Sequence, residues 1–170
     1  MGLISLRLAT AADAEQIREI YNYEVQNTTA TFDLVPRTLA DQQQWLAERS
    51  GAFATIVAVA TDAPPDTPTI VGFGALSPYK ERAAYRTSVE NSVYVRRGRH
   101  GEGIGRLLLT ELLATASRSG FHTVFARINA ASEASVALHR ACGYEPVGIE
   151  REVGRKFGRW HDVALMQRLL

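Results

Sequence analysis

The chain has 170 residues, 46% of them apolar and 22% charged, and its formal net charge is +1. This length and composition predict a single globular domain over residues 1–170 with a sizeable core. A charge so close to zero argues against nucleic acid or an anionic membrane surface as the main partner, because neither would be strongly attracted. Cys142 is the only cysteine, which excludes a disulfide framework and a thiolate metal site. No stretch is apolar enough for a membrane span or a signal peptide, so we expect a cytoplasmic protein.

Apolar or alternating runs predict strands at residues 4–8, 53–60, 70–76, 88–95, 124–128, 144–150 and 162–169. Amphipathic segments predict helices at residues 10–25, 38–48, 104–116 and 132–141. Thr10 with Asp13 and Thr38 with Asp41 are capping pairs for the first two helices. Ser132 can cap the last helix. A proline-rich loop is expected at 61–68, and a turn at 154–158 is expected to join the last two strands.

The turn after the strand at 88–95 is the most informative feature of the chain. Gly101, Gly103 and Gly105 carry no side chain that would keep a ligand from the backbone. The helix that follows directly presents its first, unpaired N–H groups to an anion. Four arginines surround the turn: Arg96, Arg97, Arg99 and Arg106. The combination predicts a binding site for a pyrophosphate.

Two known phosphate-binding patterns do not match this segment, and their absence narrows the kind of pyrophosphate that it could bind. The dinucleotide pattern G-x-G-x-x-G requires glycine where this chain has Arg106 or Leu108. A P-loop requires Gly-Lys followed by Ser or Thr, and neither Gly103 nor Gly105 is followed by lysine. What remains, residues 100–105 with the sequence His-Gly-Glu-Gly-Ile-Gly, resembles the acetyl-CoA motif of the GNAT N-acetyltransferases. That motif reads Gln/Arg-x-x-Gly-x-Gly/Ala, so this chain departs from it at its first position.

The resemblance covers essentially the whole chain and implies an α+β GNAT fold. Such a fold has a mixed, mostly antiparallel sheet that is splayed between its fourth and fifth strands, with helices on both faces. It also implies acetyl-CoA as co-substrate, with the pantetheine arm in the splay and no metal. The residues that it assigns to acetyl-CoA are Val93, Tyr94, Val95, His100, Gly101, Glu102, Gly103, Ile104, Gly105, Arg106 and Ser132. At the last of these the family often has asparagine.

Acetyl transfer to an amine requires a group that removes a proton from the amine. Alternation along the strand before the turn places Glu90 on one face with Ser92 and Tyr94, opposite Val89. On position alone, a solvent-facing carboxylate and a catalytic base are equally good interpretations. Residues 78–95, however, resemble one GNAT branch, the phosphinothricin and methionine sulfoximine N-acetyltransferases. That resemblance implies that Glu90 is the general base.

The same resemblance implies substrate contacts at Lys80, Arg82 and Tyr85, whose Lys-x-Arg-x-x-Tyr spacing matches the branch. Two cations and a phenol can bind an α-carboxylate and a second acidic group. A solvated basic loop is the alternative for the two cations. Phe32 matches the aromatic position of the loop that covers the amine. Residues 156–163 resemble the last hairpin of the branch, and membership of that branch implies a homodimer.

His139 is the second candidate catalytic residue. It lies four residues before Gly143, where most GNAT enzymes carry tyrosine and this branch carries histidine. An imidazole that titrates near neutrality can donate or accept a proton, although a single helical histidine can equally be structural. With Glu90 as its partner, His139 would assist proton transfer.

We therefore expect an acetyl-CoA-dependent N-acetyltransferase that acts on the α-amine of a small amino-acid-like acid, of the phosphinothricin or methionine sulfoximine type. Two alternatives remain open. A GNAT enzyme for an aminoglycoside or a protein N-terminus would favour an acidic pocket over Lys80 and Arg82. A non-catalytic sensor of acyl-CoA would not need Glu90 together with His139.

Overall fold

A computed structural model describes residues 3–49, 51–64, 67 and 69–170. Within them, seven strands form one sheet in the order β1-β2-β3-β4-β5-β7-β6. The strands are β1 (Ile4–Leu8), β2 (Thr55–Ala60), β3 (Ile70–Pro78), β4 (Ser88–Val95), β5 (Thr123–Asn129), β6 (Glu145–Lys156) and β7 (Arg159–Leu169). The helices are α1 (Ala14–Asn27), α2 (Leu39–Ala47), α3 (Ile104–Arg118) and α4 (Glu133–Ala141), with 3₁₀ turns η1 (Ala11–Asp13) and η2 (Ala83–Tyr85).

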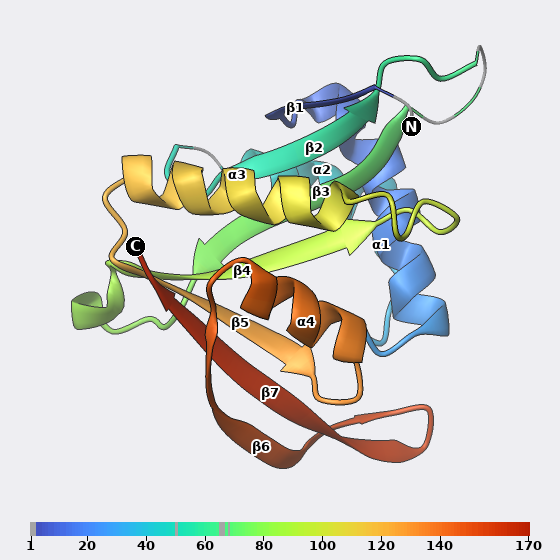
Figure 1. The fold of residues 1–170 in the computed structure, drawn as a ribbon. Helices are drawn as coiled ribbons and strands as arrows, with labels where there is room; N and C mark the ends of the chain where they lie inside the picture. Colours follow the sequence, from blue (N-terminus) through green and yellow to red (C-terminus); the bar gives the residue numbers. More distant parts are fainter. Residues whose placement is uncertain (1–2, 50, 65–66, 68) are drawn as a thin grey trace.

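The contact between β4 and β5 is short, and it is the one parallel contact among the strand pairs of this sheet. It begins at Ser88 opposite Thr123 and ends at Glu90 opposite Phe125. Beyond that point the two strands diverge, as Figure 1 shows. The sheet therefore opens in its middle, directly after Glu90.

Helices cover both faces of the sheet, because its inner strands alternate between two cores. In β2, Ile56 and Ala58 belong to the core that includes Leu108 of α3. Val57, between them, belongs to the second core, which includes Ile17 of α1. In Figure 1, α3 and α4 lie in front of the sheet and α1 behind it. The expected mixed, mostly antiparallel and splayed sheet with helices on both faces is confirmed.

The last two strands form the expected antiparallel pair but are longer than expected, so the turn predicted at 154–158 is confined to its last two residues. Gly154 is still paired with His161, and the chain reverses at Phe157 and Gly158, whose φ angles are 51° and 72°. Two consecutive left-handed residues suit a two-residue hairpin turn, whose twist matches the flanking strands. A phenylalanine rarely adopts positive φ, so the sequence did not signal this position.

Two capping predictions hold and one fails. Thr38 Oγ1 accepts a hydrogen bond of 3.1 Å from Asp41 N at the start of α2. Thr10 N donates to Asp13 Oδ2 at 2.7 Å, although this pair encloses η1 before α1 begins. The Ser132 side chain makes no capping hydrogen bond. Asn129 organises that turn instead, because its Oδ1 accepts a 2.9 Å hydrogen bond from Ala131 N.

No helix in the described part of the chain is both long and apolar enough to span a membrane. The same residues contain no cluster of three or more His, Cys, Asp or Glu side chains that could hold a metal ion. Residues 65, 66 and 68 of the expected proline-rich loop lie outside the described residues.

Candidate active site

The glycine turn has the backbone geometry of an anion site. Gly101 and Gly103 adopt φ angles of +84° and +80°, and a Cβ at either position would meet nothing within 4 Å. Gly103 is the N-cap of α3, and the first hydrogen bond of this helix runs from Leu107 N to Gly103 O. The amides of residues 104–106 therefore point out of the open end of the helix. The exposed Arg106 adds positive charge in the first turn.

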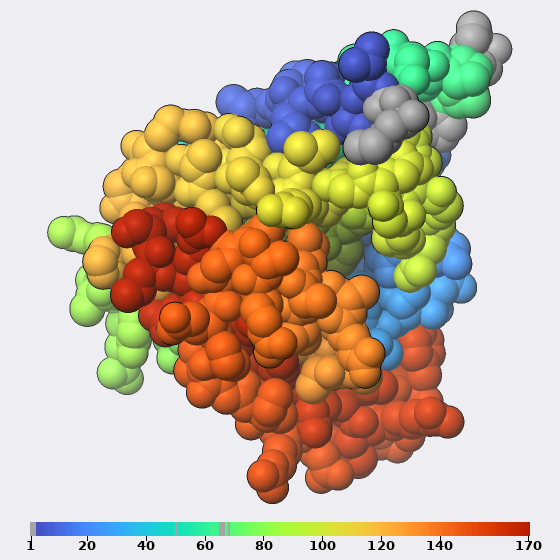
Figure 2. All heavy atoms as spheres, in the orientation of Figure 1, coloured from blue at the N-terminus to red at the C-terminus, as the bar shows by residue number. Residues whose placement is uncertain are grey.

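Gly105 has a different role from the other two glycines. A Cβ at this position would lie 3.1 Å from Leu138 Cδ2 and 3.7 Å from Val95 Cγ2. The absence of a side chain therefore lets α3 approach α4 and β4 closely. Figure 2 shows the yellow-green glycine turn and the orange α4 on the same face of the molecule, with a recess between them.

Three of the four arginines near the turn are engaged in ion pairs with carboxylates of the protein. Their partners are Glu19 for Arg96 at 3.2 Å, Glu24 for Arg97 at 3.0 Å and Glu102 for Arg99 at 2.6 Å. The pair of Arg99 with Glu102 lies within the turn itself, so the Glu102 side chain binds an arginine of the turn and only its backbone amide is left for a ligand. Positive charge at the turn is consequently smaller than the sequence suggests.

The splay leaves one side of β4 without a strand partner. Pairing of β4 with β3 continues to Val95 opposite Gly72, whereas pairing with β5 stops at Glu90. The backbone of residues 91–95 on the β5 side is thus open to an extended ligand. Val93 and Val95 pack on the α3 core, and Tyr94 points to the other face, against Tyr21 with ring centroids 5.2 Å apart.

Glu90 lies where β4 and β5 separate, and its side chain is 30% exposed. Burial raises the pKa of its carboxyl above the ordinary value of 4.5. Arg127 of β5 partly opposes that rise, with Nε 3.5 Å from Glu90 Oε2, while the negative charge of Glu150 on β6 adds to it. A carboxylate with a raised pKa at the mouth of an opening is suited to accept a proton.

Sequence reasoning missed Arg127 and Glu150. Arg127 Nη1 donates to both carboxylate oxygens of Glu150, at 2.9 and 2.7 Å. The available signal was a cation inside an otherwise apolar strand, in the segment Phe-Ala-Arg-Ile-Asn of residues 125–129. Its significance depends on the proximity of Glu90, which the sequence does not reveal.

His139 belongs to a buried polar network on the opposite face of β4 from Glu90. Its Nε2 lies 3.0 Å from Asn91 Nδ2, and its Nδ1 lies 2.8 Å from the carbonyl oxygen of Ser135. Since the carbonyl can only accept, Nδ1 carries the proton and Nε2 accepts from the amide of Asn91. Tyr144 Oη donates to Asn91 Oδ1 at 2.8 Å. The expected partnership of His139 with Glu90 is therefore not formed, because adjacent residues of a strand point to opposite faces.

Three of the four predicted substrate residues, Lys80, Arg82 and Tyr85, lie on the loop between β3 and β4. Lys80 Nζ is 4.9 Å from the ring centroid of Tyr79 and 5.2 Å from that of Tyr85. Tyr79 stacks at 4.1 Å on Phe125, which is the register partner of Glu90. Lys80, Arg82 and Tyr85 are exposed, with Arg82 immediately before η2. Tyr79 therefore attaches this basic loop to the strand beside Glu90.

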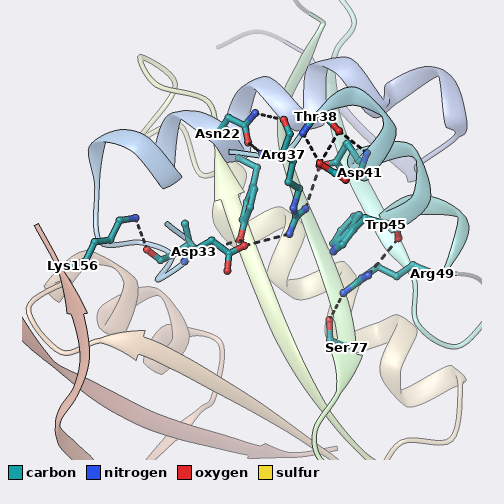
Figure 3. A network of polar contacts seen from close by, with 12 residues as sticks. Asn22, Asp33, Arg37, Thr38, Asp41, Trp45, Arg49, Ser77 and Lys156 are labelled. Atoms are coloured by element: carbon teal, nitrogen blue, oxygen red, sulfur yellow. Dashed lines mark hydrogen bonds and ion pairs between the residues drawn. The ribbon is translucent and has the colours of Figure 1, made fainter. Parts of the chain in front are cut away.

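Phe32 is held against the last hairpin. Its ring is 5.9 Å from that of His161, and a Cβ at Gly154 would overlap it. The buried Lys156 donates to the carbonyl oxygen of Thr31 at 2.8 Å, and burial lowers the pKa of its ammonium. Figure 3 shows Lys156 reaching from the hairpin to this loop. The C-terminal hairpin thus fixes the loop that precedes α2.

A second set of contacts in Figure 3 joins α2 to β3 near Glu90. Arg49 Nη2 donates to Ser77 Oγ at 3.1 Å, and Ser77 is directly opposite Glu90 in the β3–β4 register. The guanidinium groups of Arg49 and Arg37 lie 3.9 and 5.0 Å from the ring centroid of Trp45. These contacts hold the helical layer on the Glu90 side of the sheet.

A family model described as an acetyltransferase (GNAT) domain matches residues 6–165. The chain belongs to the GNAT acetyltransferase family. The acetyltransferase uses acetyl-CoA as its co-substrate. The predictions of family, fold and co-substrate are confirmed, whereas the roles of individual residues remain predictions.

Similar proteins cover nearly the whole acetyltransferase. A phosphinothricin N-acetyltransferase of Streptomyces coelicolor is 39% identical over 98% of this chain and 96% of its own length. An L-methionine sulfoximine/L-methionine sulfone acetyltransferase of Pseudomonas aeruginosa is also 39% identical, over 96% of this chain and 92% of its own. The crystal structure of a phosphinothricin acetyltransferase from Sinorhizobium meliloti in complex with AcCoA is 37% identical, covers 98% of this chain and 88% of its own, and has a TM-score of 0.90.

Proposed function

We propose that this acetyltransferase transfers the acetyl group of acetyl-CoA to the α-amine of a small amino-acid-like acid, of the phosphinothricin or methionine sulfoximine and sulfone type. The names of the two relatives that are 39% identical support this substrate class. The observation that carries the proposal is the position of Glu90. It is a partly buried carboxylate with a raised pKa at the point where β4 and β5 separate.

The backbone of the chain would bind the co-substrate. The amides of residues 101–106 would hold its pyrophosphate. They lie at the N-terminal end of α3, and the glycines there have no side chains that would block a ligand. The unpaired edge of residues 93–95 would donate backbone hydrogen bonds to the extended arm and orient the thioester. Acetyl-CoA supplies the activated acetyl group as a thioester. His100, beside the glycine turn, and Ser132, at the start of α4, would add side-chain contacts to acetyl-CoA.

Glu90 would take a proton from the substrate ammonium, directly or through water, so that the amine can attack. The nitrogen then bonds to the acetyl carbon and the carbon–sulfur bond breaks, while the proton that the nitrogen loses passes to the departing sulfur, which leaves as the thiol. Lys80, Arg82 and Tyr85 would bind acidic groups of the substrate, and Phe32 would cover it. We assign His139 to holding Asn91 at the start of the unpaired edge, because proton transfer through Nε2 would first require breaking that hydrogen bond.

The Glu90→Gln variant tests this proposal. We expect kcat to fall by about 10²–10⁴, since general base catalysis contributes that much, while the Kd of acetyl-CoA stays the same. The readout is thiol release with methionine sulfone as acceptor, beside calorimetric titration of acetyl-CoA. Glu111→Gln, which alters an exposed α3 carboxylate paired with Arg118, is the control. Unchanged turnover in Glu90→Gln would contradict the proposal.

We also propose a cytoplasmic homodimer. Cytoplasmic action is supported by the need for acetyl-CoA, a metabolite of that compartment. Dimerisation is supported by the outer strand β6, which has a free edge and exposes Val147, Ile149 and Val153 by 52–55% each. Exposed apolar side chains along a free edge favour pairing with a second copy. Sedimentation velocity would test it, and a monomer at micromolar concentration would contradict it.

A further inference from the structure

Arg127 is unusual for its place in the fold. It lies on β5 opposite Leu165 of β7, two residues beyond Phe125, the last residue of β5 that is paired with β4. Ala126 and Ile128, beside it in sequence, point into the core under α3. Arg127 points to the opposite face, where its side chain is 36% exposed. A long cation is thus presented on the face of Glu90, at the mouth of the splay.

Glu150 forms an ion pair with Arg127 through a single guanidinium nitrogen, Nη1. Both of its carboxylate oxygens accept hydrogen bonds from Arg127 Nη1, at 2.9 and 2.7 Å. The contact of Nε with Glu90 is much looser, at 3.5 Å, which is beyond the usual range of an N–H···O hydrogen bond. Arg127 Nε therefore faces Glu90 without donating a hydrogen bond of normal length to it, and the guanidinium edge that contains Nε can still donate to another group. Such an edge can bind a carboxylate with two parallel hydrogen bonds.

The spacing of Glu90 and Arg127 matches an α-amino acid. In such a molecule the amine nitrogen and the carboxylate carbon are joined through one carbon and lie about 2.5 Å apart. Arg127 Nε lies 3.5 Å from Glu90 Oε2. A substrate whose amine is bound to Glu90 would therefore bring its own α-carboxylate next to this guanidinium. The charges of the protein and the substrate are also complementary, since the substrate ammonium would lie against the anionic Glu90 and its α-carboxylate against the cationic Arg127.

We propose that Arg127 binds the α-carboxylate of the acceptor amino acid and that Glu150 is the positioning residue that holds its guanidinium for this purpose. The inference rests on the proposed function, because it takes Glu90 as the group that binds the amine. It leaves Lys80 and Arg82, on the exposed loop between β3 and β4, to the acidic or polar group at the far end of the substrate side chain.

The test compares methionine sulfone with its α-carboxamide, which keeps the amine but lacks the negative charge. The readout is the ratio of kcat/KM for acid and amide, measured by thiol release. We expect the full-length wild-type enzyme to prefer the acid by about ten- to a hundredfold, less than for a fully enclosed polar site because Arg127 is partly exposed. In Arg127→Gln the ratio should approach one, through a raised KM for the acid.

Further variants separate binding from structure. Arg127→Lys should keep part of the preference, because it retains the charge without the paired geometry. Glu150→Gln should lower the preference less than Arg127→Gln does. Arg118→Gln, a change of the same type on the exposed surface of α3, should leave the ratio unchanged. Changes in the pKa of Glu90 affect both acceptors and cancel in the ratio.

The outcomes distinguish this inference from the proposed function. If the wild-type enzyme acetylates methionine sulfone, loses that activity in Glu90→Gln, and keeps its acid preference in both Arg127 variants, the role of Arg127 is refuted and the function stands. If it acetylates neither the acid nor the amide, the proposed function itself is refuted. If the ratio collapses in Lys80→Gln and not in Arg127→Gln, the α-carboxylate is bound by the loop and this inference is wrong.

Discussion

His139 and Asn91 are hydrogen-bonded in the interior of the protein, with Nε2 of the imidazole 3.0 Å from the amide Nδ2. His139 is 4% exposed and Asn91 is 6% exposed. The bond defines the state of the ring, because an imidazole that accepts at Nε2 and donates at Nδ1 is neutral. Protonation would replace this acceptor with a second donor facing an amide N–H. Burial accordingly lowers the pKa of His139 below the ordinary value of 6.5.

This neutral histidine makes stability depend on pH. Well above pH 6.5 the imidazole is neutral whether the chain is folded or unfolded, so its contribution to stability is complete. As pH falls from 6.5 towards the lowered pKa, the unfolded chain takes up a proton that the folded chain resists, and stability is lost. We expect the free energy of unfolding to decrease in that window by up to about 1.4 kcal/mol per pH unit.

Urea denaturation between pH 5 and pH 7.5 would measure the effect. His139→Gln should lose about 1–3 kcal/mol at pH 7.5, where Asn91 is left poorly paired, and should show a flatter dependence on pH. His122→Gln removes an exposed histidine and should retain the wild-type profile. An equally flat profile in the wild-type protein would show that His139 does not titrate in this way.

The ion network around Glu90 should set the acidic limb of the activity profile. Because burial raises the pKa of Glu90 above 4.5, kcat/KM should fall at a pH higher than that of an ordinary glutamate. Glu150→Gln removes a negative charge that raises this pKa and frees Arg127 to approach Glu90, so the limb should move to lower pH. Arg127→Gln should move it to higher pH. Profiles of kcat/KM from pH 4.5 to pH 8 would show both shifts, and Glu111→Gln should shift neither.

Gly103 should be required for acetyl-CoA binding. Alanine at this N-cap must adopt a left-handed conformation with φ near the observed +80°, at a cost of about 1–2 kcal/mol, and relaxation of that strain would displace the amides at the start of α3. We expect Gly103→Ala to lower the unfolding free energy by that amount and to raise the KM for acetyl-CoA. Gly120→Ala is a matched control, since Gly120 has φ +81° at the other end of α3. It should lose similar stability without a change in that KM.

Gly154 should control the position of Phe32. A methyl group at Gly154 would overlap the Phe32 ring, so Gly154→Ala must displace the loop that precedes α2. We expect a higher KM for the amine acceptor and a nearly unchanged KM for acetyl-CoA. Gly148→Ala, on the same strand with nothing within 4 Å of its Cβ, should alter neither. If both variants behave alike in steady-state kinetics, Phe32 does not cover the acceptor.

The features that could be predicted from the sequence are local in the chain. Alternation along residues 88–95 correctly separated Glu90 and Tyr94 from Val89 and Val93, because a strand turns successive side chains to opposite faces. The glycine turn and its helix were recognisable because left-handed φ angles and open helix ends arise within a few residues. Acetyl-CoA as co-substrate followed from this segment together with the family resemblance.

Tertiary structure alone decided the partners of these residues. Arg96 and Arg97 surround the glycine turn in sequence, yet they pair with Glu19 and Glu24 of α1, more than 70 residues earlier in the chain. His139 was expected beside Glu90, but its bond to Asn91 places it on the other face of β4. Arg127 became a candidate only when three strands brought it between Glu90 and Glu150. Charge and acidity depend on distances between remote segments, and those distances are set by how the strands and helices pack.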